Sequence, residues 1–209
     1  ICLRTILGHQ DAVTTLAVDV DADVDQIVSG SEDSTVKVWD TVRGVCLRTL
    51  SGNKGSVDGL AAVSDRSDWV VSKSSDENSI RVWNTKSGVC MRVLAGHESS
   101  VTALAAMSRS DRQLVISADY YGTIKVWDTE SGECLRILTG HTNWIYALAV
   151  LKSKDQIVSG SGDNTIKVWD VKSGLCLCNL TGHTDSVNAL AVNSKNQVVS
   201  GSDDETIRV

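Results

Sequence analysis

The sequence predicts an all-β protein made of similar antiparallel sheets, and three observations support this. The first is a repeat of TIKVWD or a close variant, whose tryptophans Trp39, Trp83, Trp127 and Trp169 stand 44, 44 and 42 residues apart. A repeat of this length indicates one structural unit copied along the chain. The second is the alternation of apolar and polar residues in VKV, IRV and IKV before each tryptophan, which is typical of a β-strand. The third is the set of Gly, Ser, Asp and Asn turns between the apolar runs.

Each copy contains the same elements in the same order. A VxxLAV run is the expected first strand, and its continuous apolar character predicts burial on both faces. The IVSGS run, the run that ends at the tryptophan and the GxCLRxL run are the expected second, third and fourth strands. No helix is expected. The first strands are placed at 13–18, 57–63, 101–106, 145–150 and 187–192.

A four-stranded sheet of this kind cannot bury both of its faces alone. Radial stacking of such sheets buries the faces and leaves only short edges, which is the β-propeller architecture. With Gly-His near the start of a copy and Trp-Asp at its end, the whole chain closely resembles the WD-repeat β-propeller family. We expect one domain, 1–209, with five repeats at approximately 8–50, 52–94, 96–138, 140–180 and 182–209, plus a strand at 1–6.

The two ends of the chain differ in strand type. The chain starts with a fourth-strand segment, ICLRTI, and ends at Val209 in a third strand, at the position before a tryptophan. We expect a piece of a larger propeller, which in this family is typically seven-bladed. The alternative is a closed five-blade ring in which the strand at 1–6 completes the last blade, and an open ring could self-associate.

The resemblance implies a buried network in each blade: Asp orients His, His bonds Ser, and Ser accepts the indole N–H of Trp. It predicts complete tetrads in blades one and four, and blade five supplies its first three members. Blade two is expected to be defective because Asn53 replaces His, and blade three because Tyr121 stands at the Asp position. We expect these two blades to be the softer ones. The network residues are His9, Ser29, Asp33, Trp39; Ser72, Trp83; His97, Ser117, Trp127; His141, Ser159, Asp163, Trp169; and His183, Ser200, Asp204.

His, Ser and Asp are also the residue types of a nucleophilic triad. A hydrolase would need one such set beside an oxyanion site and a substrate pocket. Here the set recurs with the period of the repeat, so it predicts a structural role and no catalytic residue. The chain is therefore not expected to be an enzyme, and a hydrolase using a tetrad Ser is the weakest alternative.

Five aromatic residues lie outside the repeat pattern. Trp69 stands where other copies have Gln and is expected to be a local edge feature. The other four fall in ADYYGT and HTNWIYAL, segments of neighbouring blades that in WD-repeat proteins emerge on the face that commonly receives peptides. Exposed Trp and Tyr are enriched at binding hot spots. The alternative is local packing, with the tyrosines filling the space of a missing Asp and the Trp lying between blades. The candidate partner-binding residues are Tyr120, Tyr121, Trp144 and Tyr146.

Cysteine recurs once in each copy, in the fourth-strand run. Equivalent positions in neighbouring copies are expected to lie beyond the distance that a disulfide can span, so buried or half-buried thiols are predicted. Free thiols indicate a reducing compartment, the cytoplasm or the nucleus. The cysteines are Cys2, Cys46, Cys90, Cys134 and Cys176, with Cys178 two residues beyond.

Composition and the remaining motifs exclude several functions. With 42% hydrophobic residues the chain can bury a core, while a net charge of −6 argues against nucleic-acid binding and no run suggests a membrane span. Asp21, Asp23, Asp25 and Glu32 have EF-hand spacing, but Gln26 replaces the required glycine and a strand must follow, so a solvated acidic hairpin is expected. No phosphate-binding loop is present. We predict no metal and no cofactor.

These observations favour a non-enzymatic scaffold that binds proteins or peptides through the loop face. The alternative from another class is a sensor or regulatory repeat domain of a larger enzyme, an NTPase or a kinase, whose catalytic domain lies outside this chain. Because function resides in surfaces added to a fold, the fold does not name the partner.

Overall fold

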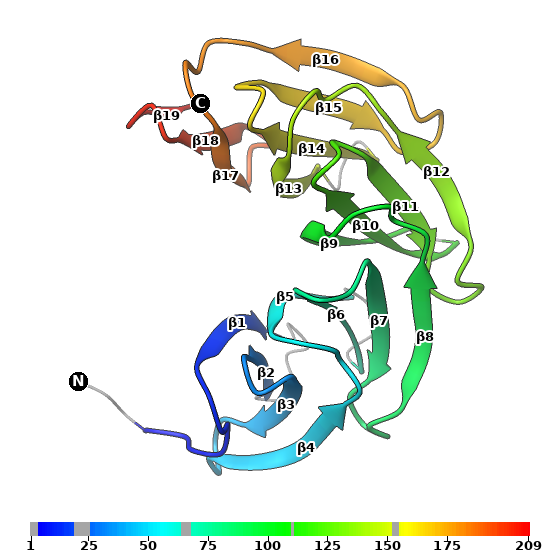
Figure 1. The fold of residues 1–209 in the computed structure, drawn as a ribbon, viewed down its shortest axis with the longest axis vertical. Coiled ribbons are helices and arrows are strands. Elements are labelled where there is room, and N and C mark those ends of the chain that lie inside the picture. The colour runs from blue at the N-terminus through cyan, green and yellow to red at the C-terminus, as the bar shows by residue number, and fades with distance from the viewer. Residues whose placement is uncertain (1–3, 19–25, 64–67, 110, 152–154) are drawn as a thin grey trace. The chain divides into compact units, whose positions relative to one another are not determined.

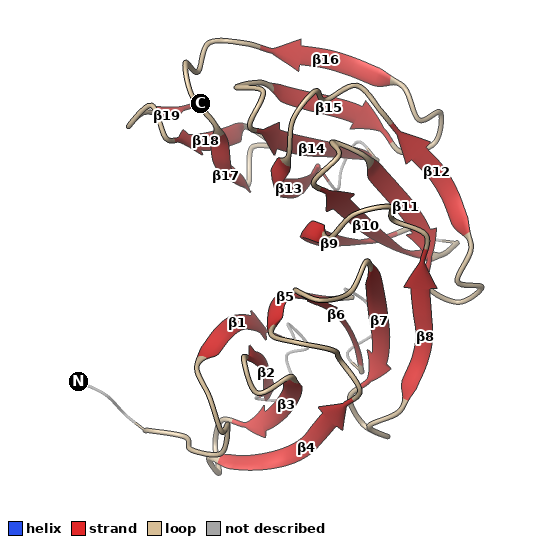
Figure 2. Cartoon of the chain, viewed as in Figure 1, coloured by secondary structure: helices blue, strands red, loops and turns tan. Residues whose placement is uncertain are grey.

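The computed structural model describes residues 4–18, 26–63, 68–109, 111–151 and 155–209, and they form an all-β protein without helices. The strands build five antiparallel sheets (Figures 1 and 2). Four sheets have four strands and the last has three. The chain divides into two compact units, Ile1–Gly96 and His97–Val209, which are described separately.

Unit 1 contains two sheets, which we call blades one and two. In each sheet the strands lie in chain order, so every connection is a hairpin between neighbours. Blade one consists of β1 (Val13–Val18), β2 (Gln26–Ser31), β3 (Thr35–Asp40) and β4 (Val45–Ser51). Blade two consists of β5 (Val57–Ala62), β6 (Trp69–Ser74), β7 (Ser79–Asn84) and β8 (Cys90–Ala95).

Unit 2 contains blades three, four and five with the same meander order. Blade three consists of β9 (Val101–Ser108), β10 (Gln113–Asp119), β11 (Ile124–Asp128) and β12 (Cys134–Leu138). Blade four consists of β13 (Ile145–Leu151), β14 (Gln156–Ser161), β15 (Ile166–Asp170) and β16 (Cys176–Leu180). Blade five consists of β17 (Val187–Val192), β18 (Val198–Ser202) and β19 (Ile207–Arg208).

Residue pairing shows why the sequence pattern repeats. Ser29 pairs with Lys37 in blade one, and Ser117 with Lys125 and Ser159 with Lys167 occupy the same register in unit 2. A one-residue slip would turn every buried side chain to the opposite face of its sheet. The regular spacing from the second-strand serine to the tryptophan therefore maintains the polar and apolar faces of each blade.

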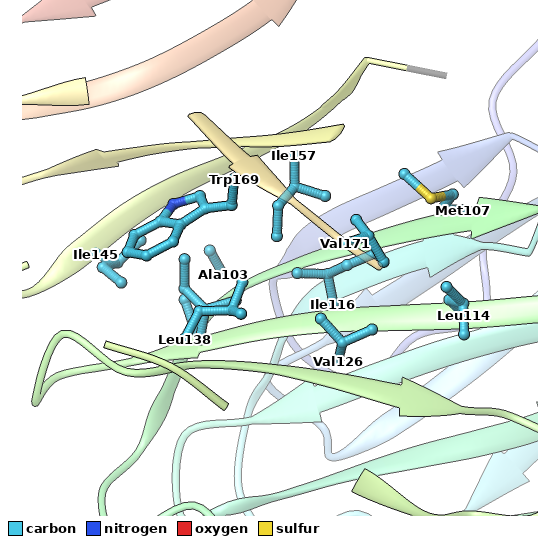
Figure 3. Packing of buried hydrophobic residues seen from close by; sticks show 12 residues of the cluster. Ala103, Met107, Leu114, Ile116, Val126, Leu138, Ile145, Ile157, Trp169 and Val171 are labelled. Carbon is cyan, nitrogen blue, oxygen red and sulfur yellow. The ribbon is translucent and has the colours of Figure 1, made fainter. Parts of the chain in front are cut away.

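The core of unit 2 lies between its sheets. Ile116 and Leu138 of blade three pack with Ile145, Ile157 and Trp169 of blade four, and all are nearly fully buried (Figure 3). Trp83 has the corresponding role between blades one and two. Burying side chains of this size provides most of the driving force for stacking, at about 2–3 kcal/mol each. The tryptophans of blades two and four thus pack against the preceding blade of the same unit.

The predicted burial of the first strands is wrong for two of the five. β5, β9 and β13 are buried or half-buried over most of their length, whereas β1 is mostly exposed and β17 largely so. All five lie at a sheet edge, so packing between blades makes the difference: β13 packs against both β9 and β17, whereas β17, in the last blade of its unit, packs against β13. An apolar run therefore does not distinguish an edge strand from a central one.

Two further predictions are corrected. Residues 4–6 of the strand expected at 1–6 have no strand structure, because a segment becomes a strand only by pairing with a neighbour and no strand of the described residues forms a ladder with it. The described cysteines are free thiols, but only Cys90 is half-buried, while the other four are exposed. Fourth strands lie at the outer edge of their sheets, which leaves most of their side chains in solvent. Cys2 lies outside the described residues.

Candidate functional site

The predicted tetrads form in blades one and four. In blade four, His141 Nδ1 lies 2.7 Å from Asp163 Oδ2, and His141 Nε2 lies 2.7 Å from Ser159 Oγ. The indole N–H of Trp169 donates to Ser159 Oγ at 2.8 Å. The corresponding distances among His9, Asp33, Ser29 and Trp39 are 2.8, 2.7 and 2.7 Å. In blade five, His183 contacts Asp204 at 2.7 Å and Ser200 at 2.8 Å.

Blade three also has a complete tetrad, which corrects the prediction that it is defective. His97 Nδ1 lies 2.7 Å from Asp119 Oδ2 and His97 Nε2 lies 2.6 Å from Ser117 Oγ. Trp127 donates to Ser117 Oγ at 2.8 Å. The carboxylate comes from two residues before the expected position, which Tyr121 occupies. The sequence does contain a sign of this change, because Asp119 stands where blades one, four and five have Ser31, Ser161 and Ser202.

Asp119 reproduces the contacts of the usual aspartate. Its Oδ1 accepts the backbone N–H groups of Tyr121 and Thr123 at 3.0 Å each, as Asp33 Oδ1 accepts that of Thr35 at 2.9 Å. Burial alone would raise the pKa of Asp119, but the hydrogen bonds from His97 and the two backbone groups outweigh it and hold the pKa below its ordinary value. The carboxylate is therefore ionised at neutral pH.

Blade two is defective, as predicted. Asn53 Oδ1 accepts a hydrogen bond from Ser72 at 2.9 Å, and Trp83 donates to Ser72 at 2.8 Å. Asn53 Nδ2 is buried without a partner among the described residues. Glu77 stands six residues before Trp83, where Asp33 and Asp163 precede their tryptophans, but it is paired with Arg81 at 2.7 Å. An unsatisfied buried polar group costs about 1–3 kcal/mol.

The geometry of the tetrads supports a structural role. Ser159 is fully buried and its oxygen already accepts the indole N–H, so it has no open side from which to attack a substrate. Burial lowers the pKa of His141, and the hydrogen bond that its Nδ1–H donates to Asp163 opposes this only in part. The neutral imidazole then completes a chain of satisfied polar groups inside the blade.

The candidate partner-binding residues come together on the surface of unit 2. The ring centroids of Tyr120 and Trp144 are 4.5 Å apart, and those of Trp144 and Tyr146 are 6.1 Å apart. Trp144 remains 46% exposed and Tyr121, next to this group, 69% exposed. We call Tyr120, Tyr121, Trp144 and Tyr146 the aromatic surface. Two segments that are more than 20 residues apart in sequence thus form one patch.

The two segments of this surface approach each other closely, and the Trp144 loop is fixed to its own blade. Gly122 has φ of 76°, and a Cβ there would lie 2.8 Å from the carbonyl oxygen of His141. Only glycine permits both this conformation and this approach of the blade-three turn to blade four. Within blade four, the Trp144 carbonyl accepts the backbone N–H of Gly162 at 2.9 Å, and Asn143 Nδ2 donates to the Gly162 carbonyl at 3.0 Å.

The loop conformation does not depend on the Trp144 side chain. Asn143 Oδ1 accepts the Trp144 N–H at 2.8 Å, and Asp11 and Asp185 make the same contact to the next residue in blades one and five. Ala12 and Ser186 occupy the Trp144 position in those blades. The proposal that the tyrosines fill the space of a missing tetrad Asp is wrong, since Asp119 fills it.

Other candidate sites give no assembled chemistry. No group of three His, Cys, Asp or Glu side chains among the described residues could hold a metal ion. Asp21, Asp23 and Asp25 lie outside the described residues. None of the described segments is a helix long and apolar enough to cross a membrane. Trp69 is half-buried at the start of β6 in unit 1 and does not belong to the aromatic surface.

Comparison with protein families identifies the class. The family model for the WD domain, G-beta repeat, matches residues 1–40, 44–84, 88–128, 132–170 and 174–209, almost the whole chain. The chain belongs to the WD40 repeat family, whose members generally mediate protein–protein interactions and are typically non-enzymatic scaffolds. No curated protein matches the chain significantly. One match to the family model, such as 132–170, covers the fourth strand of one sheet and the first three strands of the next sheet among the described residues.

Proposed function

We propose that the chain is a non-enzymatic protein-binding domain and that the aromatic surface of unit 2 contacts the partner. The observation that carries this proposal is the contact between the rings of Tyr120 and Trp144, which come from neighbouring blades and remain 40% and 46% exposed. Large, rigid aromatic side chains bury much area on binding and lose little conformational entropy.

The repeat itself argues that these side chains are not required for folding. Ser100 and Ser186 occupy the Trp144 position, and Thr102 occupies the Tyr146 position, in other blades of the same unit. The loop contacts of blade four are also those of its neighbours. A large aromatic residue at each place therefore has a use beyond the packing of the blade.

The free thiols are compatible with a cytoplasmic or nuclear location.

The test is affinity capture with a double variant, Trp144→Ser with Tyr146→Thr, which carries residues that the protein uses at the same positions elsewhere. Proteins captured by the unmodified chain should be strongly reduced on this variant. The matched control is Trp69→Gln, since Gln26 and Gln156 occupy that position in blades one and four. Equal capture by all three proteins, with circular dichroism showing each one folded, would refute the proposal.

A further inference from the structure

The end of unit 2 that carries the aromatic surface has an unusual charge distribution. Six segments form this end: 96–100, 119–123, 139–144, 162–165, 181–186 and 203–206. Together they contain seven acidic residues and neither Lys nor Arg. The acidic residues are Glu98, Asp119, Asp163, Asp185, Asp203, Asp204 and Glu205.

These segments lie together because of strand pairing and contacts between blades. Val101 pairs with Asp119 and Ile145 with Ser161, so the start of each first strand is beside the end of the second. Tyr120 and Trp144 join blade three to blade four, and Asn164 Nδ2 donates to the Thr184 carbonyl at 3.1 Å between blades four and five. The acidic residues therefore share one end of a compact unit.

The opposite end of the same unit differs. Its turns mix basic and acidic residues, and a cavity of about 240 Å³ there is lined in part by Arg109, Arg112, Arg136 and Lys172. Arg109 forms an ion pair with Asp155 at 3.0 Å and Arg112 with Asp111 at 3.0 Å. The single sign of charge is thus a property of the aromatic end and not of the unit as a whole.

Exposed carboxylates lie in the loops that contact the turns of blades three and four. Glu98 belongs to the loop whose Ser100 carbonyl accepts the Tyr120 N–H at 3.3 Å. Asp185 is exposed in the loop that receives Asn164 from blade four. The tetrad acids add to the negative potential although their own hydrogen bonds are made. Burial alone would raise the pKa of Asp163, but hydrogen bonds from Thr165 and others hold it below its ordinary value, so this carboxylate stays ionised.

We infer that the aromatic surface with Glu98 and Asp185 binds a segment of a partner protein that is rich in lysine or arginine. This inference rests on the proposed function and specifies the partner's chemistry. Cations are attracted to the faces of Trp and Tyr rings, and carboxylates add long-range attraction. The six segments themselves contain no Lys or Arg, and the Arg208 side chain lies against Gly182 in blade five, away from the rings of blades three and four. Such a segment therefore meets mainly negative charge, whereas an acidic segment would be repelled.

The first test is selection from a random peptide library on the immobilised chain and, in parallel, on the Trp144→Ser, Tyr146→Thr variant. We expect peptides retained only by the unmodified chain to be enriched in Lys and Arg and depleted in Asp and Glu. Retained peptides that are neutral or acidic would overturn this inference but leave the proposed function standing. If both proteins retain the same peptides, the proposed function fails as well.

The second test uses charge reversal with the strongest selected peptide as the probe. Glu98→Lys and Asp185→Lys should each weaken binding about tenfold, and binding should weaken between about 0.05 and about 0.3 M salt. Glu133→Lys is the control. Glu133 is exposed in the turn at the other end of blade three, and its substitution changes the net charge by the same amount. An equal effect of all three variants would show that only net charge matters and would overturn the inference.

Discussion

The carboxylate of Asp119 lies 2.7 Å from His97 Nδ1, although Asp119 stands two residues before the position that the other blades use for this contact. Tyr121, at the usual position, is left 69% exposed. Two changes relative to the repeat, Ser to Asp and Asp to Tyr, are thus linked. The first retains the buried network, and the second places an aromatic side chain on the surface.

Replacing Asp119 with the Ser of other blades should destabilise blade three by about 1–3 kcal/mol, because the buried His97 loses its hydrogen-bond partner. Adding Tyr121→Asp should restore most of this stability, since it recreates the arrangement of blade four. Hydrogen exchange of the β10 and β11 amides measures both effects. If the double variant is no more stable than Asp119→Ser alone, the two positions are not equivalent.

Blade two should open more readily than blade three. Its Asn53 Nδ2 is buried without a partner among the described residues, whereas the blade-three network is satisfied throughout. Amides of β6 and β7 should therefore exchange faster than those of β10 and β11 in native-state hydrogen exchange. Slower exchange in blade two would show that the network does not control the stability of a blade.

Acidification should destabilise the protein partly through His141. Burial lowers the pKa of this group in the folded state, so the unfolded chain binds the proton more readily as pH falls through about 6.5. His141→Asn, which copies Asn53, removes this effect. Between about pH 7.5 and about pH 5.5 the unmodified chain should lose up to about 1.4 kcal/mol more than the variant. Urea unfolding at both pH values measures the difference, and parallel losses would contradict the assignment.

The exposed cysteines should react with a maleimide in the native protein. Cys176 and Cys178 should be modified rapidly and the half-buried Cys90 slowly. Cys134 is exposed as a residue, but partial desolvation raises the pKa of its thiol although Lys125 opposes this, so less of it is thiolate at neutral pH and it should react more slowly than its exposure suggests. Peptide mapping by mass spectrometry after timed quenching measures each site. Uniform protection of all the described thiols would indicate that the fourth strands are covered in solution.

The Trp144→Ser, Tyr146→Thr variant should lower the free energy of unfolding by about 1–3 kcal/mol, because two contacts between rings are lost at about 0.5–1.5 kcal/mol each while the blades keep their own cores. Thermal unfolding of the variant beside Trp69→Gln provides the comparison. A loss of several kcal/mol would mean that the aromatic surface mainly joins blades three and four, and would remove the main support for a binding role.

Most of the fold could be predicted because local patterns repeat with little change. The second and third strands were located by the serine, the alternating apolar residues and the tryptophan, and these same residues form the network in blade four. Burial was predicted less well. The apolar run of β1 resembles that of β9 and β13, but β1 is mostly exposed while those two are buried or half-buried, and this difference depends on packing between blades.

The sequence by itself determined the repeat, the β-structure and the WD40 family. The repeat length, the turn residues and the alternation of apolar and polar residues in strands are local properties, and each copy contains them. Tertiary structure alone decided which carboxylate reaches His97 and whether Tyr120, Trp144 and Tyr146 meet. Those relationships depend on how a turn of one blade lies against a loop of the next, where Gly122 approaches the His141 carbonyl. A distance between two segments is set by the packing of sheets, and residue spacing along a single chain does not contain it.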